Sequence, residues 1–188
     1  MENIKGELAL GLIQITLDQL KKICPFAPRG FDAYVPYLNK FMPMYGIDTI
    51  DKVRAFIAQV AHESGSFRYT SELASGKDYE GRKDLGNIHP GDGVKFKGHG
   101  LIQITGRSNH LECGKALGID LINTPLLLTT PKYAVQSACW FWQKRKLNEI
   151  AERNKDGWFI DITKKINGGL NGLRDRQEFW ERAMKAIV

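Results

Sequence analysis

The stretch Val53–Phe67, VRAFIAQVAHESGSF, decides the fold of this chain, because it joins a helical repeat to an abrupt stop. Four apolar residues recur at positions i, i+3, i+4 and i+7, the spacing of one apolar helix face: Val53, Phe56, Ile57 and Val60. Ser64-Gly65 follows and predicts the end of the helix. We therefore expect an amphipathic helix that presents His62-Glu63 at its C-terminal end.

Helical patterns also dominate the sequence on both sides of this stretch. Thr16 and Gln19 have the spacing of a capping box, which predicts a short helix to about Ile23, ended by Cys24-Pro25. Apolar spacing predicts further helices at about 31–42, 107–117, 131–146, 159–167 and 173–187. No repeat or linker divides the chain, so we expect one mainly α-helical domain over residues 1–188, with 1–45 as a candidate small N-terminal helical lobe.

The segment from about Ser75 to Gly100 breaks the helical pattern. It is rich in glycine and contains Pro90. Irregular segments of this length are uncommon in a compact domain unless they have a function. Val94–Phe96 and Leu101–Ile104 are expected to pair as a small β-hairpin beside this loop.

Composition limits the classes of partner. The chain has 188 residues, 27 Lys and Arg against 21 Asp and Glu, and a net charge of +6. A chain of this size buries about 70% of the surface that it exposes when unfolded. The positive charge suits a polyanionic partner, either nucleic acid, an anionic membrane surface or a cell-wall polymer. No nucleic-acid-binding motif accompanies the charge, and no apolar run of about 20 residues predicts a spanning helix.

Metal and disulfide chemistry find little support in the sequence. The three cysteines, Cys24, Cys113 and Cys139, are widely spaced, and we expect buried, reduced thiols. His62-Glu63 fails the zinc-protease pattern H-E-x-x-H because position 66 is Ser. The other histidines, at 89, 99 and 110, are expected to be ordinary surface residues. We therefore expect no metal and no cofactor, and the N-terminus lacks the pattern of a secretory signal.

A pair of carboxylates is the strongest candidate for chemistry. We expect Glu63 to be buried against Phe67, which would raise its pKa and keep it protonated as an acid. Glu72 follows nine residues later, beyond a turn that lets the chain reverse. One dry and one solvated carboxylate are what glycosidic hydrolysis requires. The spacing alone is equally compatible with two solvated surface residues.

A polar cluster follows the glycine-rich loop. Gln103, Thr105 and Asn109 carry a hydroxyl and two amides that could hold a water or a sugar. The alternative is a polar strand end with a helix cap. Tyr79, Trp140 and Trp142 could stack on sugar rings, although tryptophans within a helical stretch more often belong to the core.

Three motifs in this order resemble family 19 of the glycoside hydrolases, which includes plant-type chitinases and phage endolysins. They are Phe56–Phe67, Gly98–Asn109 (GHGLIQITGRSN) and Ile166–Gly169 (INGG), and the match covers about residues 50–182. Tyr79–Arg82 and Leu85–Gly93 are more similar to the endolysin branch. The resemblance implies a lysozyme-like helical fold.

The resemblance also implies roles for individual residues. Glu63 would be the general acid, Glu72 the general base with Glu80 as its competitor, and Thr105 the residue that holds the nucleophilic water. The amides of Gln103, Asn109 and Asn167 would bind substrate or water. Arg176 would tune the carboxylate network, and His62 would support the cleft beside the acid. Members of the family invert the anomeric centre, which implies carboxyl groups about 6.5–9.5 Å apart.

The function implied first is an endolysin that cleaves the β-1,4-linked glycan strands of bacterial peptidoglycan. Such a protein would act as a monomer, accumulate in the host bacterial cytoplasm, and reach the wall in the periplasm after release by a holin, without stable membrane insertion. A chitinase acting on N-acetylglucosamine polymers is the alternative. A non-catalytic glycan-binding module on the same fold is a third hypothesis, and nucleic-acid binding a fourth.

Overall fold

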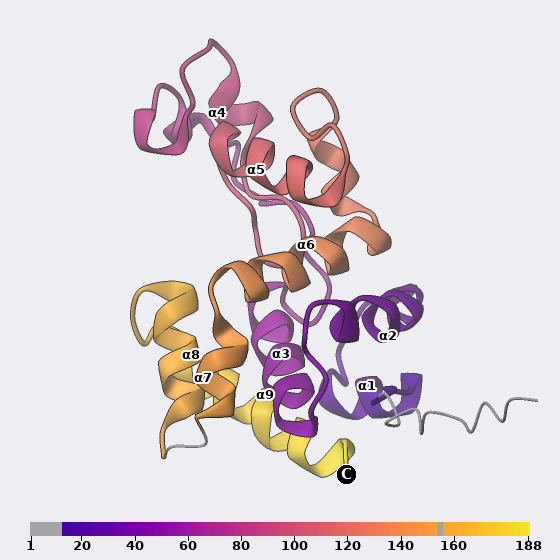
Figure 1. Cartoon of the computed structure of the whole chain (residues 1–188). Coiled ribbons are helices and arrows are strands. Elements are labelled where there is room, and N and C mark those ends of the chain that lie inside the picture. The colour runs from indigo at the N-terminus through magenta and orange to yellow at the C-terminus, as the bar shows by residue number, and fades with distance from the viewer. Residues whose placement is uncertain (1–12, 154–155) are drawn as a thin grey trace, which may run out of the picture.

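The computed structural model describes residues 13–153 and 156–188, and it is almost entirely helical (Figure 1). Nine α-helices are described: α1 (Leu17–Ile23), α2 (Val35–Met44), α3 (Ile50–Glu63), α4 (Asp92–Lys95), α5 (Arg107–Leu117), α6 (Pro131–Lys144), α7 (Leu147–Glu152), α8 (Trp158–Asn167) and α9 (Leu173–Ala186). Short 3₁₀ helices cover Phe31–Tyr34, Lys77–Tyr79, Lys83–Leu85 and Pro125–Thr129. The predicted helices are confirmed, whereas α4 and α7 were not foreseen.

The chain forms two lobes (Figure 1). The large lobe contains α1–α3 and α7–α9, and the small lobe contains α4, α5 and the loops of residues 71–130, with α6 between the two. Each lobe has its own apolar core. The larger core is built on α3, and the smaller one includes Ile104, Cys113, Leu121, Leu128 and Trp140. The helices of residues 17–44 contribute Leu20, Leu38 and Met42 to the larger core, which they share with α3 and α9.

Helix α3 is the centre of the large lobe, as its sequence predicts. Thr49 caps its first turn by accepting a hydrogen bond from the Lys52 N–H. Val53, Phe56, Ile57 and Val60 are all buried. The helix packs along α9 and ends at Glu63, so the acidic side chain lies at the surface of the core and not within it.

The turn after α3 has a strained backbone, which side-chain contacts stabilise. Ser66 and Phe67 have left-handed φ angles of 62° and 63°, which are costly for residues with a Cβ. The Ser64 hydroxyl donates to the Val60 carbonyl and accepts from the Phe67 N–H. The Phe67 ring packs 5.2 Å from Tyr34, between ring centroids. These contacts offset the strain and reverse the chain directly after Glu63.

The predicted β-hairpin of Val94–Phe96 with Leu101–Ile104 is wrong, because residues 101–103 form a turn and neither segment is a strand. Val94 and Lys95 lie in α4, because Asp92 at its start is fixed by the Arg107 guanidinium and by the His89 N–H. In the described part of the chain, strand pairing is limited to isolated bridges of His99 with Ser71 and with Ile104. The rest of the 75–100 segment is irregular, as expected.

Two of the predicted surface histidines are buried. His99 and His110 lie in the small lobe with 1% and 0% of their surfaces exposed, and their rings contact each other. The expectation failed because the loop of residues 98–106 folds over α5. His89 is exposed, as expected. The three cysteines are free and buried, which confirms the expectation of reduced thiols.

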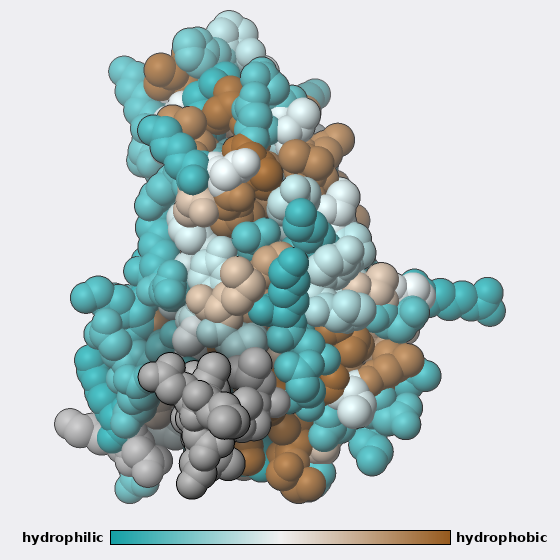
Figure 2. All heavy atoms as spheres, turned by 45° about the vertical axis from the view of Figure 1, so that its right-hand side comes forward, coloured by the Kyte–Doolittle hydropathy of each residue, from teal (hydrophilic) through white to brown (hydrophobic). Residues whose placement is uncertain are grey.

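The surface is mainly hydrophilic, with hydrophobic patches between polar side chains on the face drawn in Figure 2. The most exposed large apolar side chains include Phe26 and Leu73. Within the described residues, no helix combines the length and the apolar character that crossing a membrane requires.

Candidate active site

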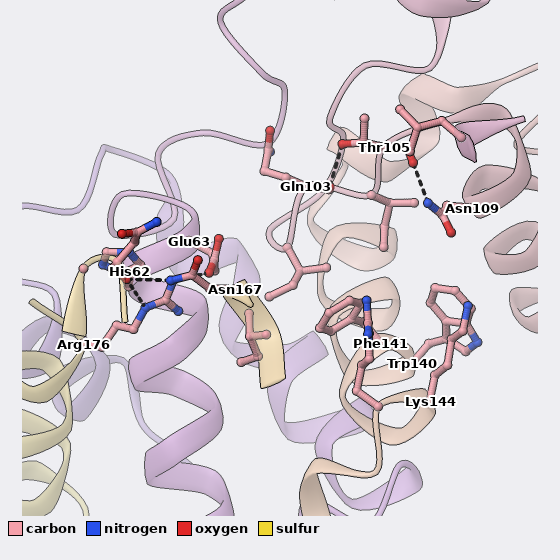
Figure 3. A pocket seen from close by; sticks show the side chains of 17 residues that line it. His62, Glu63, Gln103, Thr105, Asn109, Trp140, Phe141, Lys144, Asn167 and Arg176 are labelled. Atoms are coloured by element: carbon pink, nitrogen blue, oxygen red, sulfur yellow. Dashed lines mark hydrogen bonds and ion pairs between the residues drawn. The ribbon is translucent and has the colours of Figure 1, made fainter. Parts of the chain in front are cut away.

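A pocket of about 470 Å³ lies between the two lobes, where the end of α3, the end of α6 and the loops of both lobes meet. Figure 3 shows Glu63, His62, Asn167 and Arg176 on one side and Thr105 and Asn109 on the other. All of the residues proposed from the sequence line this pocket except Glu72: His62, Glu63, Gln103, Thr105, Asn109, Asn167 and Arg176. The tertiary structure thus brings together residues from four separate stretches of sequence.

The Glu63 carboxylate is fixed by a buried polar chain. Arg176, which is only 2% exposed, donates from Nη2 to Glu63 Oε1 at 2.5 Å and from Nη1 to Gln59 Oε1 at 2.5 Å. The buried Gln59 amide donates in turn to Thr163 Oγ1 at 2.8 Å. Because each member has a partner, the guanidinium can be buried without an unsatisfied donor. Gln59 and Thr163 were not identified from the sequence.

The surroundings of Glu63 differ from the sequence expectation. Its side chain is 22% exposed and faces a guanidinium, and the Phe67 ring lies in the core against Tyr34. The prediction of an acid buried against Phe67 is therefore wrong. The cause is the left-handed turn at residues 65–67, which directs Phe67 away from the end of α3.

His62 is oriented by two contacts that sequence spacing does not indicate. Its Nδ1 lies 2.6 Å from Asp175 Oδ2, and because a carboxylate only accepts, Nδ1 carries the hydrogen. The ring also lies against Gly172, where an added Cβ would come within 2.2 Å of His62 Cε1. Gly172 has a φ of +70°, so it permits both the turn before α9 and the approach of the imidazole.

The opposite wall is a network built on backbone carbonyls. Thr105 Oγ1 donates to the Gln103 carbonyl at 3.0 Å, and Asn109 Nδ2 donates to the Thr105 carbonyl at 2.7 Å. Gln103 has a left-handed φ of 53°, and its amide donates to the Gly100 carbonyl. Because the Thr105 hydroxyl uses its hydrogen internally, its lone pairs are available to accept from a water in the pocket.

Glu72 lies beside the pocket wall and does not line the pocket. Its Oε1 accepts from the Tyr79 hydroxyl and its Oε2 from the Gly98 N–H, both at 3.0 Å. Burial and the Glu72 carboxylate raise the pKa of Tyr79, so this hydroxyl stays a donor. Gly98 also contacts the Gln103 side chain, since an added Cβ would lie 2.6 Å from Gln103 Oε1. Gly98 therefore lies between Glu72 and the part of the pocket wall that Gln103 forms.

Glu80, the competitor of Glu72, is occupied by the loop that follows it. Its two carboxylate oxygens accept from the Gly91 and Gly93 N–H groups at 2.7 and 2.8 Å. Both oxygens therefore support the 91–93 turn at the start of α4. Both oxygens of Glu72 are likewise engaged, so Glu72 stays the preferred candidate base only through the family spacing.

The end of α6 adds an aromatic and basic floor to the pocket, formed by Trp140, Phe141 and Lys144, which Figure 3 labels, together with Arg145. Lys144 lies over the Trp140 ring, and Arg145 over the Phe141 ring. The i, i+4 spacing of both pairs was the available signal for these contacts. None of the four residues was assigned to the site from the sequence. Trp142 instead packs edge-on against Phe56 in the core.

On the side of Glu63, Asn167 donates to the Asn171 carbonyl at 2.8 Å across the turn between α8 and α9. Among residues 13–153 and 156–188, no three His, Cys, Asp or Glu side chains are grouped so as to hold a metal ion. An acidic side chain that faces a hydroxyl and amides across a groove suits the acid-catalysed hydrolysis of a polysaccharide.

Comparison with known proteins supports this chemistry. The family profile of Chitinase class I matches residues 28–155. A glycosyl hydrolase family 19 domain-containing protein of Haemophilus influenzae is 32% identical over 160 residues, covering 69% of this chain and 76% of that protein. An endochitinase of Arabidopsis thaliana is 34% identical over 156 residues, covering 80% of this chain and 52% of that protein.

Solved structures show the same fold at low identity. Chitinase C from Streptomyces griseus superposes with a TM-score of 0.76 at 21% identity, covering 97% of this chain and 79% of that chain. A class IV chitinase from Zea mays gives a TM-score of 0.69 at 20% identity, covering 89% and 90%. The chain belongs to family 19 of the glycoside hydrolases, and it spans about half of the Arabidopsis protein.

Proposed function

We propose that this chain acts as one catalytic domain that hydrolyses the β-1,4 glycosidic bonds of bacterial peptidoglycan by a single inverting displacement. The observation that carries the proposal is the pocket between the lobes, in which Glu63, fixed by Arg176, faces Thr105 and Asn109. Membership of family 19 supports glycan hydrolysis. The net charge of +6 and the basic floor of the pocket favour an anionic glycan over a neutral one.

In the proposed mechanism, Glu63 donates its proton to the glycosidic oxygen as the bond from that oxygen to C1 breaks. Arg176 stabilises the carboxylate that remains, and its buried contact with Gln59 keeps it in place. A water that donates a hydrogen bond to the Thr105 hydroxyl attacks C1 from the opposite face of the sugar and forms the new bond from its oxygen to C1. Glu72 takes the proton of this water, so the proton count balances and the anomeric centre inverts.

The test is to incubate the protein with purified peptidoglycan and with chitin and to identify the new reducing ends by mass spectrometry. We expect cleavage of peptidoglycan, with muramic acid ends for lysozyme-type cleavage or glucosamine ends for glucosaminidase cleavage. Glu63→Gln and Glu72→Gln should each lower the rate by about 10²-fold or more, whereas Glu80→Gln should retain most of it. Full activity of Glu63→Gln would overturn the assignment of the acid.

A chitinase is the second candidate function, and a specific finding favours it. The relatives described above include an endochitinase, and chitinase C has a similar fold. The same residues would act on a neutral polymer of N-acetylglucosamine. Products from chitin alone would establish this alternative and reject cleavage of peptidoglycan.

The biological setting is part of the same proposal. We infer an endolysin that is monomeric, accumulates in the cytoplasm of a host bacterium and cleaves peptidoglycan glycan strands in the periplasm after release by a holin. Supporting this are the similarity of residues 79–93 to endolysins and the buried, free cysteines, which suit a reducing compartment. Lysis of a bacterial culture that depends on co-expression of a holin would test it.

A further inference from the structure

A second, basic hollow of about 220 Å³ adjoins the catalytic pocket. It is lined by six residues: Arg145, Lys146, Glu149, Ile150, Arg153 and Lys165. Arg145 lines both the catalytic pocket and this hollow, so the two are neighbours at the end of α6. The other residues come from α7, from its C-terminal end and from α8, which pack side by side (Figure 1).

The basic hollow has an excess of positive charge. Four cationic side chains line it against one carboxylate, Glu149, whose Oε1 lies 3.8 Å from Lys146 Nζ. Arg145, Arg153 and Lys165 form no ion pair with any carboxylate of the described residues. The hollow thus differs from single surface cations in gathering three side chains without an acidic partner around one concave surface.

Such clustering is unfavourable in the isolated protein, because like charges within a Debye length of about 8–10 Å repel each other. An anionic ligand removes this repulsion, and arginine binds carboxylates through two parallel hydrogen bonds. The open shape of the hollow and its exposed side chains suit a branch of a polymer and not an enclosed small molecule.

We propose that the basic hollow binds the carboxylates of the peptide stems on a peptidoglycan strand whose sugars occupy the catalytic pocket. This inference rests on the proposed function and specifies how the site selects its substrate. The stems are covalently attached to the glycan, so a strand in the catalytic pocket carries them past Arg145 into the hollow. Chitin has no such groups, and the hollow contributes nothing to its binding.

The experiment compares Arg153→Glu/Lys165→Glu with the control Lys22→Glu/Lys185→Glu. Both double variants change the net charge equally, all four side chains are exposed, and the control residues line neither hollow. Each pair is placed in the inactive Glu63→Gln background, and binding is measured by cosedimentation. The probes are sacculi free of teichoic acid and the same glycan stripped of its peptides by an amidase.

We expect Arg153→Glu/Lys165→Glu to weaken binding to peptide-bearing sacculi by about tenfold or more relative to the control, as the loss of charge-assisted contacts predicts. Binding to stripped glycan should equal that of the control. Arg153→Gln/Lys165→Gln should give an intermediate loss. Equal losses on both glycans, or no loss on the peptide-bearing one, would overturn the proposal.

Cleavage by the active protein separates this inference from the proposed function. If sacculi are cut but the Arg153 and Lys165 variants bind and cut them like the control, the function stands and the stem-binding role is rejected. If the protein cuts only chitin, the proposed function is rejected by the cleavage products alone. In that case, cosedimentation of the inactive variants would still show whether the hollow binds the peptide stems.

Discussion

At the scale of single residues, the site depends on groups that do not themselves perform chemistry. Arg176 is buried between Glu63 and Gln59, and an isolated guanidinium in that position would carry a large desolvation penalty. The Gln59 amide and the Thr163 hydroxyl complete its hydrogen bonding. The candidate acid is therefore oriented from within the core of the large lobe.

Gly172 allows the first prediction at this scale. Gly172→Ala places a methyl group in the space of the His62 ring and also strains a left-handed residue. Gly168→Ala is a matched control, since Gly168 has a similar φ of +76° but no atom within 4 Å of an added Cβ. Both should lose about 1 kcal/mol of unfolding free energy to backbone strain.

Only Gly172→Ala should displace His62 from Asp175, so its kcat/KM should fall about tenfold or more below that of Gly168→Ala. Urea unfolding and steady-state kinetics on the same preparations check the two effects. Equal activities of the two variants would show that the position of His62 does not affect the reaction.

At the scale of elements, the loop that presents Thr105 is supported by a pair of histidines. His110 Nδ1 lies 2.9 Å from the Gly106 carbonyl, and His110 Nε2 lies 3.0 Å from His99 Nδ1. A carbonyl only accepts, so His110 carries its hydrogen on Nδ1 and accepts at Nε2 from His99. These two hydrogen bonds require a neutral His110. The one from His110 Nδ1 ends on the carbonyl of Gly106, which follows Thr105 in the chain.

The histidine pair predicts a loss of stability in acid. Burial lowers the pKa of His99 and of His110 to about 4, from an ordinary value near 6.5. Between these values the unfolded chain binds more protons than the native one, so stability is greatest above about pH 6.5 and falls as the pH decreases towards 4. From pH 7 to pH 5 the free energy of unfolding should fall by roughly 2–4 kcal/mol.

Urea titrations at successive pH values measure this dependence. His110→Gln should flatten it, because one of the two buried groups no longer titrates. His89→Gln is the matched control, since His89 is exposed, and it should leave the slope unchanged. An unchanged slope in His110→Gln would contradict the origin assigned to it.

At the scale of the whole molecule, the two lobes and the charge determine how a polymer reaches the site. The pocket lies between the lobes, and the basic hollow lies beside it with Arg145 in both linings. The net charge of +6 attracts an anionic polymer over a distance set by the ionic strength.

Salt should therefore affect the two candidate substrates differently. Raising NaCl from about 20 mM to about 300 mM shortens the Debye length several-fold and should lower kcat/KM on peptidoglycan by about tenfold. The rate on a neutral chitin oligosaccharide should change less than twofold, which serves as the control. Equal salt effects on both would remove electrostatic attraction as a basis for selectivity.

Much of the fold was predictable because it depends on local patterns. The apolar spacing of 53–60 predicted α3, and Thr16 with Gln19 predicted the start of α1, since neighbours along the chain decide both. Val94–Phe96 was wrongly predicted as a strand, because the ion pair of Asp92 with Arg107 stabilises a helical turn there. Such distant contacts leave no periodic signal.

The amino-acid sequence by itself determined the helical class, the reduced cysteines and, through its motifs, seven of the residues that meet in the pocket, since periodicity, composition and motif order are properties of the chain. The resemblance assigned Arg176 to the carboxylate network, but only the tertiary structure decided that Glu63 does not pack against an apolar ring and that Glu80 supports a loop. It also decided that Arg145 lines both hollows. The physical reason is that side-chain environments come from packing between segments far apart in the sequence, and burial and charge neighbours are fixed only when these segments meet.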